Sequence, residues 1–422
     1  MKPGFYTIMA AQFFSSLADN ALLIVAISVL ASTSSPAWMT PMLKLFFVTS
    51  YVILAPFVGA FADALPKGRV MFVTNLVKIA GCLLMFFSVH PLLAYAVVGF
   101  GAAAYSPAKY GILTELLPAE KLVAANGWIE GLTVLSIILG TVLGGALVSE
   151  KFAAAMTGVL PVNPLELSVS LEVALGVVMI AYVLAALFNL KIPDTGAHYP
   201  AQERHPLRLV IDFSHCFVVL WKDRLGQISL AVTSLFWGAG ATLQFIVLKW
   251  AEKALNMPLA QGAILQGVVA FGVAFGAMAA ARRVPLKKSL TVMPLGFAMG
   301  VIVILMVMVS NVAVAYPLLV LIGALSGYFV VPMNALLQHR GHVLMSAGHS
   351  IAVQNFSENL SILMMLGFYA LLIKLDLGID VVIILFGLFV AGVMWMVMRR
   401  HAANQREYDS LHLIGEQKHV GT

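Results

Sequence analysis

The chain has 422 residues, of which 61% are hydrophobic and only 10% are charged, and its mean hydropathy is +0.96. Soluble globular proteins carry about 25% charged residues, so this composition excludes a soluble domain and predicts a polytopic membrane protein. The net charge of +6 does not indicate nucleic acid as a partner, because the basic residues are scattered over short loops. Cys82 and Cys216 are expected to be two free thiols.

Twelve apolar runs are long enough to cross a bilayer as helices, which takes about 20 residues each. The first run contains an acid and shows no cleavage pattern, so we expect a retained helix rather than a signal peptide. The runs cover 7–30, 42–62, 70–89, 91–113, 122–148, 169–190, 226–249, 259–281, 289–309, 314–337, 345–373 and 379–398. The fold class predicted is an all-α membrane protein with twelve transmembrane helices in two six-helix halves.

The longest polar interval, 191–225, separates an N-terminal half (1–190) from a C-terminal half (226–398), which a tail (399–422) follows. This interval contains "HPLRLVIDFSHCFVVLW", which predicts a helix lying along the inner membrane interface or a simple connector. Spans four and ten, "GAAAYSPAKYGILTELL" and "GALSGYFVVPMNALLQ", both place a proline after a glycine-rich stretch. This weak repeat supports a duplicated six-helix unit, in which substrate sits near the midplane between the halves.

The distribution of basic residues predicts the orientation. If the N-terminus is cytoplasmic, 18 lysines and arginines fall on the cytoplasmic side and five on the other. Two more, Lys78 and Lys109, fall inside spans. Because cytoplasmic loops carry the excess of basic residues, both termini are expected to be cytoplasmic.

Five ionisable side chains are expected at membrane depth: Asp19, Lys78, Lys109, Glu130 and Glu358. Each would cost at least about 2.5–3.5 kcal/mol facing lipid, so each should face the bundle interior or a water-filled cavity. Asp19 and Glu358 are predicted near the midplane. These groups could simply hold helices in register, with Lys109 paired to Glu130, Lys78 to another acid, and Asp19 bonded to a neighbouring helix.

The loop between spans two and three reads "GAFADALPKGRVMF". It resembles the loop signature of the major facilitator superfamily in Gly59, Asp63, Gly68 and Arg69. That resemblance implies a conformational latch, in which Asp63 caps a helix end and pairs with basic groups. A plain turn with an exposed ion pair is the alternative.

A closer resemblance covers nearly the whole chain. The blocks "AQFFSSLADNALL", "APFVGAFADALPKGRV", "TSLFWGAGATLQF", "FVVPMNALLQ" and "SIAVQNFSENL" resemble the bacterial lysophospholipid transporters. The resemblance implies a monomeric protein of the inner membrane that moves lysophosphatidylethanolamine and related lysolipids inward. An acyltransferase/acyl-carrier-protein synthetase then reacylates the lysolipid on the cytoplasmic face, and no nucleotide is hydrolysed. The chain departs from the family at Gln244, where a basic residue is expected.

A phosphoethanolamine head group carries a phosphate, which suits lysine, and an ammonium, which suits a carboxylate. Lys109 is the predicted phosphate contact, because Pro107 removes a backbone hydrogen bond and could open the helix beside it. The apolar remainder of the spans suits a single acyl chain. The full predicted substrate-binding set is Asp19, Asn20, Tyr51, Lys78, Lys109, Glu130, Trp237, Gln244, Gln354, Asn355 and Glu358.

Other functional classes have weaker support. The sequence contains no nucleotide phosphate loop, no H-E-x-x-H and no paired-cysteine motif, so we expect no enzyme activity, no cofactor and no metal. The main rival is a proton-coupled antiporter of amphipathic or drug-like compounds, with Asp19 and Glu358 carrying protons. A receptor or scaffold that transports nothing would have no use for buried paired charges.

The glycines of span five are relevant to the alternative of a proton-coupled antiporter. Gly131, Gly140, Gly144 and Gly145 give a partial antiporter-like pattern, with Thr141 where a proline is expected. Alternatively, Gly140 and Gly144 form a G-x-x-x-G face for close helix packing. The same packing pattern occurs in span eight, at Gly272 and Gly276.

Overall fold

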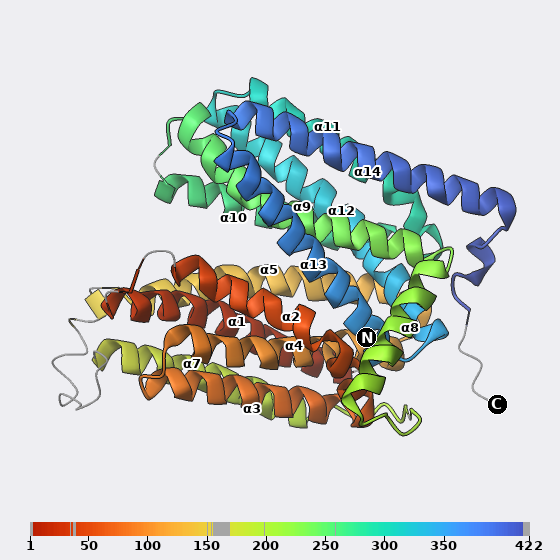
Figure 1. The fold of residues 1–422 in the computed structure, drawn as a ribbon, viewed down its shortest axis with the longest axis horizontal. Helices are drawn as coiled ribbons and strands as arrows, with labels where there is room; N and C mark the ends of the chain where they lie inside the picture. The colour runs from red at the N-terminus through yellow and green to blue at the C-terminus, as the bar shows by residue number, and fades with distance from the viewer. Residues whose placement is uncertain are drawn as a thin grey trace. The chain divides into compact units, whose positions relative to one another are not determined.

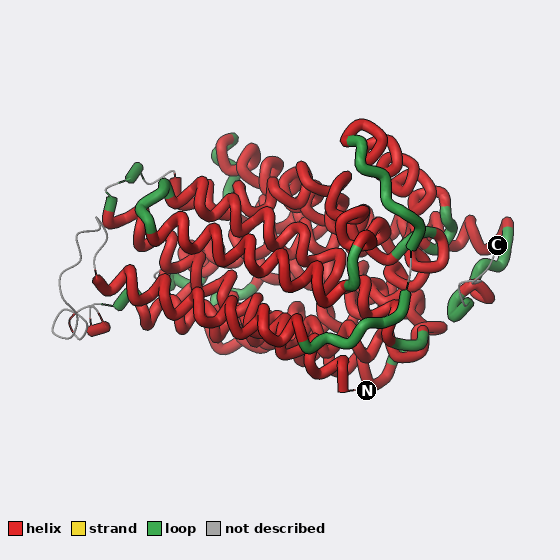
Figure 2. The backbone as a smooth tube through the Cα atoms, turned by 90° about the horizontal axis from the view of Figure 1, so that it is seen from below, coloured by secondary structure: helices red, strands yellow, loops and turns green. Residues whose placement is uncertain are grey.

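A computed structural model describes residues 3–33, 35–36, 39–149, 151–152, 154, 169–197, 199–257 and 259–416. Within these residues, the backbone consists of helices and loops (Figure 2), and twelve helical segments are long and apolar enough to cross a membrane. This confirms the predicted number. The helices are α1 (Pro3–Ser32), α2 (Met39–Ala64), α3 (Lys67–Phe86), α4 (Pro91–Leu116), η1 (Ala119–Lys121), α5 (Leu122–Leu147), α7 (Val169–Leu190), α8 (Pro206–Lys222), α9 (Gly226–Ala254), α10 (Leu259–Arg283), η2 (Leu286–Val292), α11 (Met293–Ile304), η3 (Leu305–Met308), α12 (Val312–Leu344), α13 (Ala347–Lys374), α14 (Ile379–Glu407) and η4 (Leu411–Leu413).

Contacts along the chain define two compact units. The first unit comprises Met1–Leu116, Leu135–Phe213 and Ala347–Ala352. The second unit is the remainder, namely Leu117–Val134, Ser214–Ser346 and Val353–Thr422. The opening residues of α13 therefore belong with the first unit, and the first part of α5 with the second. The duplication of six-helix halves stays a prediction.

In the first unit, α3 packs against α4 and α7, α1 packs against α7, and α2 packs against α4 (Figure 1). The apolar core includes Leu22, Met85, Leu175 and Tyr182, all of them buried. Lipid tails are as apolar as leucine, so helix association in a membrane depends on close packing and polar contacts rather than on the hydrophobic effect. The buried polar groups of this unit therefore contribute to its assembly as well as to any site.

Small residues set the closest helix contacts. In the second unit, a Cβ added at Gly272 or Gly276 of α10 would collide with the backbone of α12, and one added at Gly323 or Gly327 of α12 would collide with α10. This confirms the predicted close-packing face at Gly272 and Gly276. The two backbones can approach closely only because these positions lack side chains.

The glycines of α5 divide into two groups. A Cβ at Gly140 would lie 3.0 Å from Asn20 Cβ, and one at Gly144 would lie 2.8 Å from the Ala21 carbonyl oxygen, so both positions pack on α1. A Cβ at Gly131 or Gly145 would meet no atom within 4 Å. Close packing therefore explains Gly140 and Gly144, as the G-x-x-x-G alternative predicted.

The predicted span 289–309 is not one regular α-helix. It consists of the 3₁₀ segment η2, then α11, then the 3₁₀ segment η3. Pro294 explains the first change, because it has no N–H to give to the Leu290 carbonyl four residues earlier. The Leu290 carbonyl accepts instead from the N–H of Met293, which is the three-residue spacing of a 3₁₀ turn.

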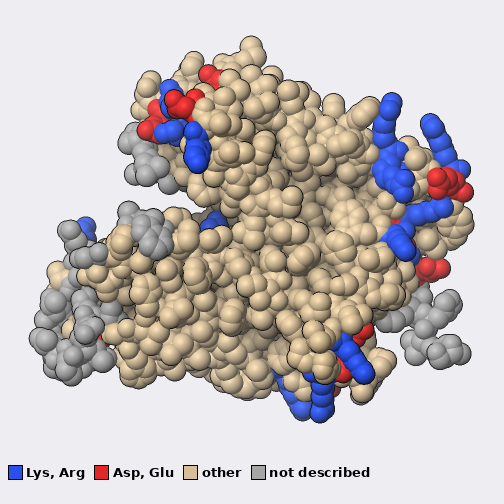
Figure 3. Space-filling model, viewed as in Figure 1, with Lys and Arg blue, Asp and Glu red and all other residues tan. Residues whose placement is uncertain are grey.

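Charged side chains are unevenly distributed over the surface. On the face drawn in Figure 3, lysine, arginine, aspartate and glutamate gather toward the ends of the helices, and the stretch between the ends is almost entirely uncharged. Such an uncharged band matches the hydrocarbon core of a membrane. Neither Cys82 nor Cys216 forms a disulfide.

Candidate functional site

A buried ion pair joins α1 to α3 in the first unit. Lys78 is 1% exposed, and its Nζ lies 2.8 Å from Asp19 Oδ2. The same Nζ donates to Ser15 Oγ at 3.0 Å. Tyr182 of α7 donates its hydroxyl to Asp19 Oδ1 at 2.7 Å. Asp19, whose side chain keeps 19% exposure, is therefore held from two neighbouring helices.

Further polar and aromatic groups surround this pair. Ser15 donates to Asn75 Oδ1 at 2.9 Å, and the ring centroids of Tyr105 and Tyr182 lie 5.0 and 5.7 Å from Lys78 Nζ. Tyrosine faces attract a cation at such distances. The pairing that the sequence left open for Lys78 is thus with Asp19, and it stabilises the packing of α1, α3 and α7.

The other predicted substrate contacts of the first unit are less enclosed. Asn20 donates its side-chain amide to the Ser16 carbonyl at 2.8 Å, within its own helix. Tyr51 is half-buried, with its ring 5.9 Å from that of Phe47. Lys109 is also half-buried, and its Nζ lies 4.1 Å from the Tyr110 ring centroid.

The expected opening of the helix at Pro107 is wrong. α4 continues as one helix from Pro91 to Leu116, with Pro107 inside it. A proline removes only its own bond to the carbonyl four residues earlier, and the rest of the ladder remains. The residues Tyr105–Ala108 are all buried, so surrounding side chains hold this turn in place.

The remaining predicted contacts lie in the second unit. Gln354 donates its side-chain amide to Glu358 Oε1 at 2.8 Å and to Asn334 Oδ1 at 3.2 Å, which joins α13 to α12. Asn355 and Glu358 are both buried. The exposure of the rest varies: Glu130 is buried, Trp237 is half-buried and Gln244 is exposed.

One polar pair of the second unit was missed. Asn126 of α5 and Gln338 of α12 exchange two amide hydrogen bonds, of 2.8 and 2.9 Å, and both side chains are buried. Amide side chains within apolar spans are a sequence signal that could have indicated buried polar contacts. The pairing of these two residues could not be predicted, because they lie 212 positions apart.

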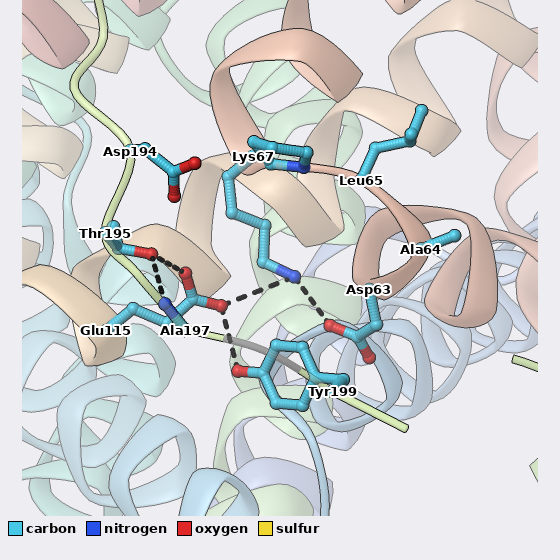
Figure 4. Close-up of a pocket in the computed structure, with 10 residues that line it drawn as sticks. Asp63, Ala64, Leu65, Lys67, Glu115, Asp194, Thr195, Ala197 and Tyr199 are labelled. Atoms are coloured by element: carbon cyan, nitrogen blue, oxygen red, sulfur yellow. Dashed lines mark hydrogen bonds and ion pairs between the residues drawn. The ribbon is translucent and has the colours of Figure 1, made fainter. Parts of the chain in front are cut away.

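The latch predicted at the end of α2 is a buried charge cluster (Figure 4). Lys67 Nζ lies 2.5 Å from Asp63 Oδ1 and 3.4 Å from Glu115 Oε1, and it donates to the Ala62 carbonyl at 2.7 Å. The three charged side chains are at most 3% exposed. The alternative of an exposed ion pair in a plain turn is therefore wrong.

The chain after α7 closes over this cluster as a strap, residues 193–197 and 199. Thr195 and Tyr199 donate their hydroxyls to the two oxygens of Glu115, at 2.7 and 2.8 Å (Figure 4). Burial and the adjacent charges of Glu115 and Asp63 raise the pKa of Tyr199 above its ordinary value, so the phenol stays a hydrogen-bond donor. A cavity of about 140 Å³, which Lys67 and Asp194 also line, remains beside them.

The other side of Asp63 faces the start of α13. Its Oδ1 accepts from the Gly348 N–H at 2.9 Å, and its Oδ2 lies 3.0 Å from His349 Nδ1. A Cβ at Gly59 would lie 3.0 Å from the His349 Cα, so only glycine fits there without a shift. Asp63 therefore ties the end of α2 to the first turn of α13.

The remaining latch residues divide between packing and exposure. A Cβ at Gly68 would lie 3.0 Å from the Asn189 carbonyl oxygen, which explains the glycine by the close approach of α7. Arg69 is exposed, and the basic partner of Asp63 is Lys67, which sequence analysis did not assign to the latch. The four-residue spacing of Asp63 and Lys67 could have indicated this pair.

The second unit repeats this arrangement at the end of α12. Arg340 pairs with Asp223 at 2.7 Å and with Glu416 at 3.5 Å, and the Gly415 N–H donates to His339 Nε2 at 2.9 Å. The chain after α7 contacts Glu115 near the end of α4, and the chain after α14 contacts Arg340 near the end of α12. Both α4 and α12 contain proline.

Known proteins resemble this chain in sequence and in fold. The family model of the Major Facilitator Superfamily matches residues 8–365. The lysophospholipid transporter LplT of Yersinia enterocolitica is 42% identical over 380 residues, which are 90% of this chain and 89% of the relative. That of Pectobacterium carotovorum is 42% identical over 373 residues, covering 88% and 87%.

Solved structures show the same fold at low identity. The human organic anion transporter MFSD10 aligns with a TM-score of 0.67 and 16% identity, over 96% of this chain and 100% of that one. A bacterial homologue of the iron transporter ferroportin aligns with a TM-score of 0.71 and 12% identity, over 95% and 100%. The chain belongs to the major facilitator superfamily and, within it, to the lysophospholipid transporter LplT family.

Proposed function

We propose that this protein transports lysophospholipids, lysophosphatidylethanolamine among them, to the cytoplasmic leaflet of a bacterial inner membrane. The observation that carries the proposal is 42% identity to lysophospholipid transporters over about nine-tenths of the chain. The buried charges of the spans support it, because a zwitterionic head group needs both signs of charge inside an otherwise apolar bundle. Transport of this kind needs no covalent step and no cofactor.

Within this proposal, Asp19 accepts the ammonium of the head group. Its carboxylate keeps 19% exposure, whereas its partner Lys78 keeps 2%, so a ligand can reach the acid but not the lysine. Lys78 and Tyr182 then hold the carboxylate in position. Lys78, predicted as one of the substrate-binding residues, is thus proposed as a positioning residue that acts through Asp19.

Lys109 is the proposed phosphate contact, because it is a half-buried cation at membrane depth and a lysine is a suitable point charge for phosphate. The exchanged pair Lys109→Glu with Glu130→Lys tests this assignment. If Lys109 serves only to pair with Glu130, the exchange restores uptake. Failure of the exchange in a folded protein supports the phosphate contact.

We further propose that the cluster of Asp63, Lys67 and Glu115 is the conformational latch. Its support is that Asp63 joins two elements 285 residues apart, through Gly348. Opening this latch would break a buried ion pair, which gives the transport cycle a defined barrier. We also propose that an acyltransferase/acyl-carrier-protein synthetase reacylates the transported lysolipid and that the transporter is a monomer.

The decisive experiment is uptake of labelled lysophosphatidylethanolamine into proteoliposomes, with and without an imposed pH gradient. We expect uptake without a gradient. Competing lysolipids with other head groups should reduce this uptake to different degrees. If the protein is inserted in the vesicles but takes up no lysolipid, the proposal is contradicted. Uptake that requires the gradient would favour the proton-coupled antiporter, with Asp19 and Glu358 as its proton carriers.

A further inference from the structure

Gln354 of α13 carries a buried carbonyl oxygen, Oε1, that has no hydrogen-bond partner among the described residues. The residue is 4% exposed and lies within the span Ala347–Lys374. Leaving a buried acceptor unbonded is unfavourable, and the hydrocarbon core of a membrane supplies no water to replace the missing bond. An unbonded acceptor at this depth in a transporter is therefore a candidate contact for the substrate.

The nitrogen of the same amide is fully engaged, which fixes the orientation of the carbonyl. Gln354 Nε2 donates to Glu358 Oε1 at 2.8 Å and to Asn334 Oδ1 at 3.2 Å. Turning the amide over would place its oxygen against these two acceptor oxygens, which cannot donate to it. The position of Gln354 Oε1 is therefore set before a ligand arrives.

Asn334 supplies part of this orientation, although the sequence did not predict it as a site residue. It lies on α12, 20 residues before Gln354, and is 2% exposed. Asn334, Gln354 and Glu358 all belong to the second unit, so their arrangement depends on that unit alone. Asn334 acts on a ligand only through the amide of Gln354.

The chemistry of Gln354 Oε1 selects the group that it binds. An amide oxygen accepts hydrogen bonds and donates none, so the ligand must offer an O–H or an N–H. A lysophosphatidylethanolamine molecule has two such groups, the ammonium of its head group and the free hydroxyl of its glycerol. The charged ammonium suits the carboxylate proposed for it, Asp19, and the neutral hydroxyl suits the neutral carbonyl of Gln354.

We propose that Gln354 Oε1 accepts a hydrogen bond from the free glycerol hydroxyl of the lysolipid, and that Asn334 is a positioning residue for this contact. The inference rests on the proposed function and names the substrate group that this amide recognises. A diacyl phospholipid has an ester in place of the hydroxyl and would leave Oε1 unbonded, so the contact favours lysolipids. Alternating access uncovers a transporter's substrate-binding groups at one stage of its cycle, and the substrate reaches this buried carbonyl at that stage.

Uptake of two substrates that differ in one group tests the proposal. They are lysophosphatidylethanolamine and its analogue with hydrogen in place of the free glycerol hydroxyl. Values of kcat/KM in proteoliposomes are compared for the unmodified protein, Gln354→Met and Asn334→Leu. The matched control is Asn359→Leu, because the Asn359 amide donates to the Asn355 carbonyl within α13, at 2.8 Å.

We expect the unmodified protein and Asn359→Leu to prefer the substrate with the hydroxyl by about tenfold in kcat/KM, which corresponds to about 1.4 kcal/mol. Gln354→Met should take up the analogue as the unmodified protein does and should show no preference for the hydroxyl. Asn334→Leu should show an intermediate preference, which a purely structural role of Asn334 would leave unchanged.

Three results would overturn the inference. If the unmodified protein takes up lysophosphatidylethanolamine and the analogue equally well, the hydroxyl is not recognised, although the proposed function stands. If Gln354→Met keeps the tenfold preference, another residue binds the hydroxyl. If Gln354→Met lowers uptake of both substrates by the same factor, its partner is the ammonium or its role is structural. An unmodified protein that takes up no lysophosphatidylethanolamine would instead contradict the proposed function itself.

Discussion

Replacing Lys78 by methionine should destabilise the protein through the carboxylate that it leaves behind. At an effective dielectric constant of about 20, two unit charges 2.8 Å apart attract by about 6 kcal/mol. Asp19 would keep the Tyr182 hydroxyl and its residual exposure, so the loss is partial. We therefore expect Lys78→Met to lower the free energy of unfolding by about 3 kcal/mol, the lower end of the range for breaking a buried pair.

The partner substitution completes a double-mutant cycle. Asp19→Asn leaves Lys78 charged and nearly inaccessible, so it should also cost about 3 kcal/mol. Removing both charges together should cost less than the sum of the single changes, by about 2–3 kcal/mol. Lys288→Met, at an exposed lysine, is the matched control and should change stability little.

Equilibrium unfolding in mixed micelles measures the stabilities, and lysolipid uptake in proteoliposomes measures function. If Asp19 accepts the ammonium of the head group, the double variant regains stability but not uptake. If the pair is structural, it regains both. If the double variant loses as much free energy of unfolding as the two single variants together, the coupling is refuted. The interpretation of Lys78 as a residue that acts through Asp19 is then refuted as well.

Three further outcomes are expected. Gly276→Ala should lower the free energy of unfolding by about 1–3 kcal/mol through overpacking against α12. Gly267→Ala on the same helix, with open space around it, should not lower it. Equal melting temperatures for the two variants would argue against the close contact. Lys67→Met should slow uptake by roughly tenfold, which corresponds to about 1.4 kcal/mol, and should leave lysolipid affinity unchanged. The control Arg69→Met should transport like the unmodified protein. Similar uptake rates for the two variants would remove Lys67 from the proposed latch. Lys109→Glu should abolish uptake of phosphate-bearing lysolipids and Lys109→Arg should keep part of it, and undiminished uptake by Lys109→Glu would contradict the phosphate contact.

The sequence by itself determined the class of fold and the approximate positions of the spanning segments. A bilayer offers backbone groups no water to bond with, so an apolar run of sufficient length must form a helix. For this reason the predicted bounds of spans such as 169–190 match α7, Val169–Leu190. The family also followed from the sequence, because several unusual blocks, such as "FSSLADNALL", resemble one group of transporters.

The tertiary structure decided which side chains meet. Asp19 and Lys78 lie 59 residues apart and Asp63 and Gly348 lie 285 apart, and no local pattern specifies such partners. A span shows which of its residues are polar, but helix packing determines which helix each polar group faces. That is why the buried acids could be identified from sequence, and the Asp63–Lys67 pair could have been, whereas the contacts of this cluster with Glu115, Thr195 and Gly348 depend on the tertiary structure.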